Sequence, residues 1–594
     1  MASEQLNEAL TRLRRSSDVD LRGTELSPEL LGRILDAVRE EDSHPVFSGF
    51  ASFVGATFLG GASFDGATFS GGASFDGVTF ADEASFVGTT FSGDADASFV
   101  GARFAGDAFF IGATFTDDAW FIETTFDSEV SFGKATFSGK ARFGGAQLNG
   151  TAWFSETTFS GEVSFDGARF SGDALFSETT FSGDALFSET TFSGDALYDG
   201  ARFSGDALFS ETTFSGDALF SETTFSGEDA MFDGVAFEMA ESFGPVVASW
   251  CLTLDRAVFS KRVVVQVSAS YLECVETRFA SGAELQLRFA CTTLRRAEFG
   301  APSAIVNAAQ PPTKRVEADE QRNEIAGLEV GPDYLQQSPA LASLEGVDVT
   351  DLVVTDIDMS PCRFAGAHHL DTLRLEGDCQ FAWPPKGARF GWTWPPVRWW
   401  TRRQVLEEEC GRRAAGSKGT GWRIHSSFNP PGATPLNAKR VAALYRDLRK
   451  AQEDSKNEPG AADFYYGEME MRRTDSATPW PERLILFLYW LVSGYGLRMT
   501  RALSCLVVLI AMASTTLYLV GLAPPRPTPP PLEIPHRLSA SVLYAAESAV
   551  SLEPKLAGLP VLTPQGEVVR LIMRVLGPLL LGLTLLAIRN RVKR

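Results

Sequence analysis

The sequence predicts a mainly β repeat protein whose last part is a helical membrane domain, and three observations support this prediction. Phenylalanines recur through residues 51–237 in alternating steps of five and six, so the repeating unit has eleven residues. Glycine falls in nearly every unit, and Phe, Thr and Ser fill most of the rest, a composition that disfavours helices. Two apolar stretches near the end of the chain are long enough to cross a membrane.

Each unit is predicted to form two very short strands separated by turns. In the half-unit Ala56-Thr57-Phe58, the alternation along a strand sends Ala and Phe to one side and Thr to the other. We therefore expect Ala and Phe in a core, Thr or Ser on a wall, and glycines such as Gly55 at the corners. The unit reads SGDALFSETTF almost verbatim at 171–181, 182–192, 204–214 and 215–225. The core side chains singled out by the pattern are Phe53, Phe58, Phe64, Phe69, Phe176, Phe181, Phe187, Phe192, Leu352 and Ile357.

The unit centres on Leu or Phe with Ala two residues before it, and in this it resembles the pentapeptide-repeat family over about 51–300 and 348–368. The resemblance implies a right-handed quadrilateral β-helix with one pentapeptide per side. The sixth residue in alternate steps departs from the family pattern and makes a coil of 22 residues instead of 20. We expect one-residue bulges at two corners, near Gly61 and Asp173 in their units.

Helices are expected to cover the N-terminal end, because an open β-helix end exposes unpaired strand edges. Leu6, Leu10 and Leu13 indicate one short helix, and a second begins at Ser27 with Pro28 at its first position. The predicted parts of the chain are an N-terminal helical cap (1–44), the β-helix (45–300), an irregular excursion (301–340), a final β-helix coil (341–382), a Trp-rich segment with a helical hairpin (383–478) and a membrane domain (479–594).

Residues 391–403 contain four Trp and three Arg. We interpret this stretch as an aromatic plug that closes the C-terminal end of the β-helix, with an interfacial membrane contact as the alternative. The segments Ala438–Glu453 and Ala461–Arg473 are predicted to pair as a helical hairpin.

The membrane domain is predicted to have two transmembrane helices, 502–523 and 568–588, and a short re-entrant segment at 538–552. A further apolar segment, 484–492, is too short to span and is expected along the interface. Basic residues flank both outer ends of the two spans, so the positive-inside rule puts both termini and the β-helix in the cytoplasm. We therefore expect a multi-pass protein of the bacterial cytoplasmic membrane. The flanking residues are Arg472, Arg473, Arg483, Arg498, Arg501, Arg589, Arg591, Lys593 and Arg594.

The order of span, short segment and span resembles the two-transmembrane potassium-channel module. The phrase DFYYGEMEMRR (463–473), followed by WLVSGYG before the first span, resembles bacterial membrane proteins that join pentapeptide repeats to such a module. The resemblance implies a pore helix at 538–552. The sequence after it reads Ser-Leu-Glu-Pro-Lys (551–555) and lacks a filter of the Thr-x-Gly-Tyr-Gly type, so we expect no potassium selectivity.

Glu547 is the acidic residue within the re-entrant segment and is a candidate functional residue, because a carboxylate at membrane depth is costly. Arg570 and Arg574 are four residues apart and share one face of the second span. We hypothesise that Glu547 pairs with one of them. In the alternative, all three lie solvated in the outer interface.

Charge and chemistry together favour recognition over catalysis. Residues 51–245, called the rod below, hold 30 Asp or Glu against 6 Lys or Arg, whereas the rest of the chain is nearly neutral. Five His and seven Cys form no zinc spacing, and the odd cysteine count indicates free thiols in a reducing compartment. No phosphate loop or nucleophile motif is present, so we expect no enzyme, metal or cofactor.

The interpretation that these features favour is a non-enzymatic, membrane-anchored scaffold that presents the acidic rod to an unidentified protein partner. One alternative is an ion channel, or a channel-like oligomer formed through the membrane domain and gated by the rod. A second alternative is a DNA mimic that binds a topoisomerase, as in the soluble quinolone-resistance proteins that the repeats resemble. Those relatives are free cytosolic dimers, so the membrane domain disfavours this alternative, and we expect no nucleic-acid partner.

Overall fold

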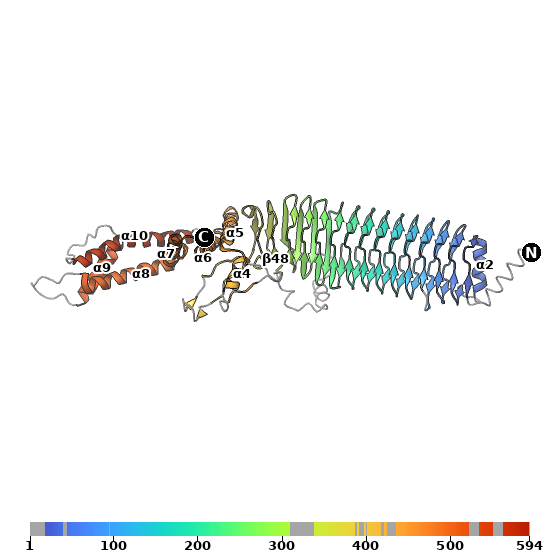
Figure 1. Cartoon of the computed structure of the whole chain (residues 1–594), viewed down its shortest axis with the longest axis horizontal. Coiled ribbons are helices and arrows are strands. Elements are labelled where there is room, and N and C mark those ends of the chain that lie inside the picture. The colour runs from blue at the N-terminus through green and yellow to red at the C-terminus, as the bar shows by residue number, and fades with distance from the viewer. Residues whose placement is uncertain are drawn as a thin grey trace, which may run out of the picture. The chain divides into compact units, whose positions relative to one another are not determined.

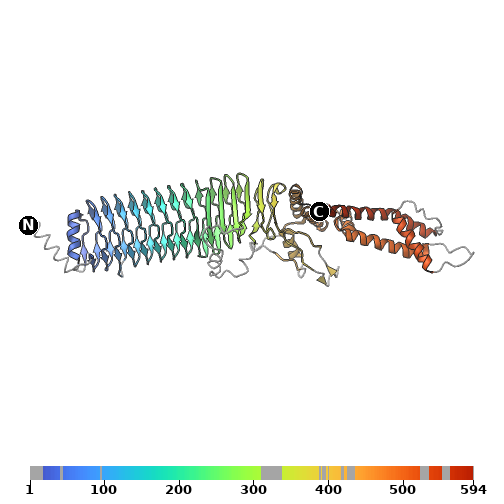
Figure 2. The ribbon, with the colours of Figure 1, turned by 180° about the vertical axis from the view of Figure 1, so that it is seen from behind.

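The computed structural model separates the chain into two compact units. Unit 1 comprises residues 1–382 and 424–431, and unit 2 comprises 383–423 and 432–594. The first is a stack of β coils and the second is mainly helical (Figures 1 and 2). The residues that the structure describes are 18–39, 44–93, 96–308, 338–386, 389–390, 397–398, 401–416, 421–424, 435–521, 534–550 and 562–592.

Unit 1 is a parallel β-solenoid whose strands form four long faces, named here A to D in the order in which one coil visits them. Face A contains β4 (Ala51–Ser52), face B contains β5 (Thr57–Phe58), face C contains β6 (Ala62–Ser63) and face D contains β7 (Thr68–Phe69). Their sheets have 14, 13, 8 and 15 strands respectively. Up to β37 (Ala236–Phe237), nearly every strand is two residues long, because a corner follows each two-residue step.

The core of the solenoid consists of stacked aromatic rings. Residues 22 apart lie above one another, so that Phe187 stacks on Phe165 at 4.9 Å and on Phe209 at 4.7 Å between ring centroids. Rings from the opposite faces A and C meet edge to face, an arrangement that aromatic pairs favour. The ten predicted core side chains are all buried, with at most 1% of each exposed. The alternation of Ala, Thr and Phe therefore places the side chains as the sequence predicts.

Two kinds of corner alternate along each coil. One kind is a turn with a residue in the left-handed region, such as Gly55 (φ 66°) or Glu178 (φ 57°). The other is a bend through Gly61 or Asp173, and it contains the sixth residue of the longer steps. Glycine is needed at this bend for a different reason, since a Cβ on Gly183 would lie 2.6 Å from the carbonyl carbon of Gly161 one coil away.

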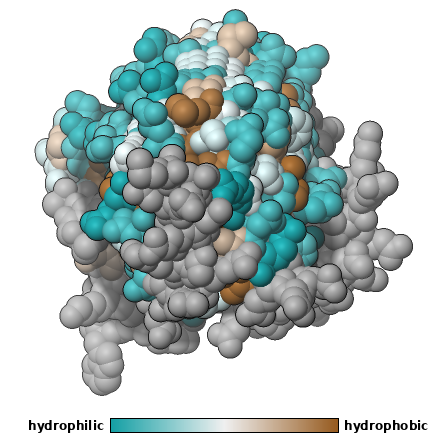
Figure 3. Space-filling model, turned by 90° about the vertical axis from the view of Figure 1, so that its right-hand side faces the viewer, coloured by the Kyte–Doolittle hydropathy of each residue, from teal (hydrophilic) through white to brown (hydrophobic). Residues whose placement is uncertain are grey.

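The N-terminal end of the solenoid is covered by helix α2 (Pro28–Val38), which lies across the first coil (Figure 1). Ser27 caps this helix by accepting a bond from the Leu30 amide, as the sequence predicts. The predicted cap of residues 1–44 is nevertheless wrong in its extent. Strands β1 (Val19–Asp20) and β2 (Glu25–Leu26) already pair with β4 and β5, so the solenoid begins at Val19. Leu6, Leu10 and Leu13 lie outside the described residues. From this end, the described surface is mainly hydrophilic, with separate hydrophobic spots (Figure 3).

The coil shortens from 22 to 20 residues one coil after Phe237, because Phe237 pairs with Phe259 but Phe259 pairs with Phe279. Face C ends at β34 (Ala218–Leu219), and face D continues in longer strands. In this part Val, Leu and Ile replace the aromatic rings in the core. Residues along the longer strands alternate between buried and half-buried, as expected for a sheet with one face on the core. The longer strands of face D are β38 (Ser242–Ala248), β41 (Val263–Ser268), β44 (Ala283–Arg288), β47 (Ser303–Asn307), β49 (Leu352–Thr355) and β50 (Arg374–Glu376). Face A continues in β39 (Cys251–Thr253), β42 (Tyr271–Glu273), β45 (Cys291–Thr293) and β48 (Ala340–Ser343).

The C-terminal part of the solenoid differs from the predicted boundaries. The predicted excursion, 301–340, begins later, because β47 still pairs with β44 on face D. Residues 338–382 form two levels where a single final coil is predicted, since Asp348 pairs with His368 and Asp358 with Gln380. These levels lack the phenylalanine spacing that marks the earlier coils, so their number could not be predicted from the sequence.

Unit 2 contains α4 (Glu407–Gly416), α5 (Ala438–Asp454), α6 (Glu458–Thr474), α7 (Trp480–Ser493), α8 (Met499–Thr516), α9 (Ile534–Val550) and α10 (Pro564–Val592). Helices α5 and α6 pack together at the position of the predicted hairpin. A π-helical segment, η3 (Leu517–Gly521), continues α8. A short antiparallel pair, β51 (Arg389–Phe390) and β52 (Val397–Arg398), is all that the structure describes of 387–400, so the predicted plug lies mostly outside the described residues.

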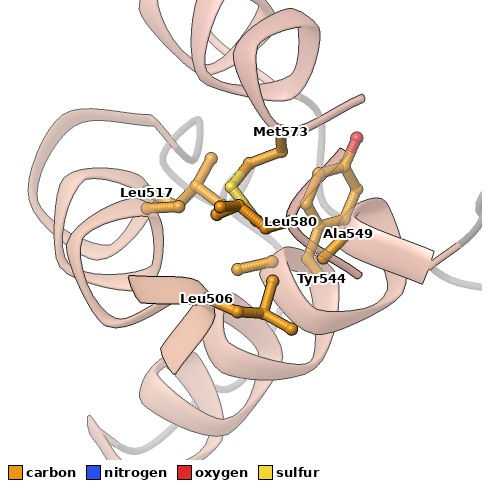
Figure 4. Close-up of a cluster of buried hydrophobic side chains, with 8 residues drawn as sticks. Leu506, Leu517, Tyr544, Ala549, Met573 and Leu580 are labelled. Atoms are coloured by element: carbon orange, nitrogen blue, oxygen red, sulfur yellow. The ribbon is translucent and has the colours of Figure 1, made fainter. Parts of the chain in front are cut away.

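Two helical segments of unit 2 are long and apolar enough to cross a membrane, Met499–Gly521 and Pro564–Arg589. Helix α9, which corresponds to the predicted re-entrant segment, packs against both of them. Their shared core is small and includes Leu506 and Leu517 from the first segment, Tyr544 and Ala549 from α9, and Met573 from α10 (Figure 4).

Candidate functional site

A buried cluster of charged and aromatic side chains joins the helices that precede the first apolar segment. This charge cluster spans α4, α5, α6, the segment before α4 and the turn between α7 and α8. Sequence reasoning missed it, because its members come from elements far apart in the chain. Its residues are Arg403, Glu409, Arg413, Tyr445, Glu470, Arg473 and Tyr495.

The centre of the cluster is the carboxylate of Glu409, whose side chain is fully buried. Arg403 donates to both of its oxygens, at 2.7 and 2.5 Å. The Tyr445 hydroxyl donates to Oε2 at 2.6 Å and accepts from the backbone amide of Leu406 at 2.9 Å. Arg413 approaches Oε1 from the next turn of α4, at 2.6 Å. Buried charges are tolerated only when they are paired and hydrogen-bonded in this way.

The cluster continues from α4 to the start of α8 through a second carboxylate, that of Glu470. Arg413 lies 3.4 Å from its Oε1, and Arg473 donates to the same oxygen at 2.6 Å. Tyr495 donates to Oε2 at 3.2 Å and accepts from Arg473 Nε at 3.2 Å. A continuous chain of bonds therefore links α4, α6 and the turn that leads into α8.

The environment keeps the two carboxylates charged and the Tyr445 hydroxyl neutral. Burial opposes ionisation of Glu409, but the guanidinium groups of Arg403 and Arg413 outweigh it and lower its pKa to about 2. Burial likewise opposes the charge on Glu470, and Arg473 and Arg413 lower the pKa of that carboxyl. Burial, reinforced by Glu409, raises the pKa of Tyr445, so its hydroxyl stays a proton donor.

The Gly494-Tyr495-Gly496 turn is what brings Tyr495 into the cluster. All three residues lie in the left-handed region, with φ values of 54°, 58° and 74°. Tyr495 is 1% exposed and packs edge to face on Tyr466 and Tyr489. The turn thus anchors the end of α7 to α6, a role in the helical region that the phrase WLVSGYG did not reveal.

A second group of contacts lies beside the first turn of α8. Arg501 donates to Thr401 Oγ1 at 3.1 Å, and its guanidinium lies over the Trp490 ring at 5.2 Å. Arg473 lies over the same ring at 4.8 Å. Arg498 donates to the carbonyl oxygen of Arg402 at 2.7 Å. Two of the arginines that flank the first span in the sequence therefore also bind the segment before α4.

The predicted membrane-domain residues lie on α9 and α10. Arg570 pairs with Glu567 of its own helix at 2.8 Å. Glu547 is half-buried on α9. Two residues later, Ala549 lies against Gly577 of α10, so closely that a Cβ added to this glycine would be 2.5 Å from the Ala549 Cα. Arg574 is half-buried on α10, about one turn before Gly577. The pairing of Arg574 or Arg570 with Glu547 remains a prediction. Residues 551–555, which bear on the channel alternative, lie outside the described residues.

Some of the aspartates of the rod hold adjacent coils together through hydrogen bonds to the main chain. The Asp173 carboxylate accepts a bond from the backbone amide of Asp195, 22 residues later, at 3.0 Å. Asp195 in turn accepts from the amide of Asp217 at 2.9 Å, and Asp184 accepts from Asp206 at 3.1 Å. These columns of aspartate stabilise one kind of corner, because each side chain satisfies a main-chain donor of the next coil. Such bonds explain many of the rod's negative charges without any partner.

Among the residues that the structure describes, no group of three or more His, Cys, Asp or Glu is arranged to hold a metal ion. Comparison with curated proteins and with solved structures gave no match. Residues 43–241 match the family model described as pentapeptide repeats (9 copies), in overlapping stretches that run from 43–79 to 198–241. The coil stack, with Phe or Leu in the core and Ala two residues earlier, agrees with this match. Residues 43–241 are thus built of pentapeptide repeats.

Proposed function

We propose that the chain is a non-enzymatic scaffold anchored in the bacterial cytoplasmic membrane, with the acidic rod presented to a protein partner in the cytoplasm. The observation that carries the anchoring is the exposed apolar surface of α8 and α10. Val507, Met512, Leu571 and Leu585 are each more than half exposed. A helix in a water-soluble domain buries such a face, whereas a membrane helix turns it toward lipid.

The charge cluster supports this proposal because it gives the first span a rigid base. It joins α4 and α6 to the turn before α8, and Arg498 and Arg501 extend it into the first turn of the span. The basic residues around the start of α8 and at the end of α10 favour the cytoplasmic side for both outer ends. The rod then offers flat walls of outward Thr, Ser, Leu and Asp, which suit recognition of another macromolecule.

Alkaline carbonate extraction of cell membranes tests the anchoring. We expect the full chain to remain in the membrane pellet after peripheral proteins are released. A variant with Val507→Asp and Met512→Asp should be lost from the pellet, because each aspartate at the centre of a span costs about 2.5–3.5 kcal/mol. The matched control, Thr57→Asp with Thr79→Asp on face B of the rod, should pellet like the wild type. Release of the wild-type chain into the carbonate supernatant would rule out the anchor.

A further inference from the structure

Face C of the rod carries a stripe of apolar side chains that point outward from the solenoid. In β22 (Ala152–Trp153), β26 (Ala174–Leu175), β30 (Ala196–Leu197) and β34 (Ala218–Leu219), the alanine is buried and the second residue faces out. These four second residues pair directly with one another from strand to strand. Trp153 is 38% exposed, and the three leucines are half-buried against their neighbours. The apolar stripe is therefore Trp153, Leu175, Leu197 and Leu219.

The fold does not require apolar residues in this column. At earlier levels of face C, the same position holds Ser63, Ser85, Phe109 and Ser131, and the strands pair in the same way whether this residue is polar or apolar. The stripe stays outside the aromatic core, which the buried alanines and phenylalanines fill by themselves. A run of outward apolar side chains that adds nothing to the core marks a contact surface.

Carboxylates line both sides of the apolar stripe. Two residues before each leucine, at the bend corner, lie Asp173, Asp195 and Asp217. Beyond the opposite ends of the same strands, at the turn corner, lie Glu178, Asp199 and Glu222. No Lys or Arg occurs between residues 170 and 201. A partner that covers this face must therefore carry positive charge on both sides of an apolar centre.

The spacing of the levels selects the backbone of that partner. The core rings beneath the stripe, Phe154, Phe176, Tyr198 and Phe220, follow one another at 4.9 Å. An α-helix laid along the rod offers one apolar position per turn, about every 5.4 Å, which stays close to the levels over four coils. A strand offers one position about every 6.7 Å and loses the register after one level. The match favours a helix.

We propose that the apolar stripe on face C is the docking surface for an amphipathic α-helix of a partner protein, with Lys or Arg on both sides of its apolar face. This proposal rests on the scaffold function proposed above and names its partner by chemistry. A second copy of the chain is the poorer occupant. Two copies that met through face C would bring the carboxylates beside their apolar stripes together, and these like charges would repel.

Binding of a designed helix to the full chain in zwitterionic lipid nanodiscs tests the proposal. The probe is a fluorescent peptide of about 18 residues, with one Leu per turn on one face, Lys on both flanks and Ala elsewhere. Fluorescence anisotropy gives its affinity, with empty nanodiscs of the same lipid as the blank. The stripe variant is Leu175→Ser, Leu197→Ser and Leu219→Ser, residues that the column already accepts at other levels. The matched control places serines on the opposite face A, where the outward apolar run, Leu186, Leu208 and Met231, is one level shorter than the stripe and contains no tryptophan.

We expect the wild type and the face A control to bind the peptide equally, and we expect the stripe variant to bind it at least about tenfold more weakly. Replacing two of the exposed carboxylates beside the stripe, Glu178→Gln with Glu222→Gln, should weaken binding and reduce its dependence on salt.

Equal binding by wild type and stripe variant, or no wild-type binding above the blank, would overturn the proposal. So would sedimentation that shows a wild-type dimer and a monomeric stripe variant, because the occupant would then be a second copy. Carbonate extraction tests membrane anchoring without the peptide, and peptide binding tests docking on face C. The two proposals can therefore fail independently.

Discussion

Replacing Glu409 by alanine should destabilise unit 2 by about 3–5 kcal/mol, because breaking a buried ion pair leaves its partners charged and desolvated. The guanidinium of Arg403 is only 4% exposed, and that of Arg413 14%. Both lose the carboxylate that balances them, and the Tyr445 hydroxyl loses its acceptor. Thermal unfolding of the full chain in detergent, followed by tryptophan fluorescence, measures the effect.

The matched control for this change is Glu453→Ala. The Glu453 carboxylate is 54% exposed and lies 3.4 Å from Arg449, one turn away on the same helix. A solvent-exposed pair of this kind contributes about 0.2–1 kcal/mol. A shift in melting temperature for Glu409→Ala no larger than that for Glu453→Ala would show that the charge cluster does not stabilise the helical region.

Deletion of one whole coil from the rod should leave a folded protein, whereas deletion of part of a coil should not. Removing residues 171–192 joins Phe170 to Ser193, and every later residue keeps its face because strands pair 22 residues apart. Removing only 171–175 moves each later side chain out of its column, so the rings can no longer stack on the coils before the deletion. Repeat arrays depend on contacts between neighbours, so loss of one intact level is tolerated.

Circular dichroism and thermal melting compare the two deletions in the full chain. We expect the 22-residue deletion to melt cooperatively near the wild-type temperature. The five-residue deletion should lose several stacked aromatic contacts, each of which is worth about 0.5–1.5 kcal/mol beyond the area it buries. Similar melting of the two proteins would contradict a solenoid with a fixed coil length.

The rod could be predicted from the sequence because its core is local and periodic. The burial of Phe53 and Phe187 follows from a spacing that repeats along the chain and from the alternation of side chains in a strand. The first two strands of the solenoid escaped prediction because they read Val-Asp and Glu-Leu and contain no phenylalanine. The outward leucines were missed for a related reason, since the pattern that identifies the core treats every second strand residue as wall.

The charge cluster could not be predicted in the same way. Tyr445 binds Glu409 across 36 residues, and Arg413 reaches Glu470 across 57. No periodicity links such residues, and charged side chains on helices are usually solvated, so the run Glu407–Glu409 carried no signal of burial. The phrase DFYYGEMEMRR, noted for its resemblance to membrane proteins with pentapeptide repeats, contains Glu470 and Arg473 and was the available indication.

Cysteine labelling tests most directly the proposed topology, in which two spans anchor the chain with the rod and both outer ends on the cytoplasmic side. Six of the seven native cysteines lie before the first span, and the seventh, Cys505, lies within it. Intact cells are treated with a membrane-impermeant maleimide, and the full chain is compared with Thr528→Cys, which lies between the two apolar segments. The account predicts that the wild type is labelled only after the cells are broken, whereas Thr528→Cys is labelled in intact cells. Labelling of the wild type in intact cells, or of Thr528→Cys only after breakage, would contradict it.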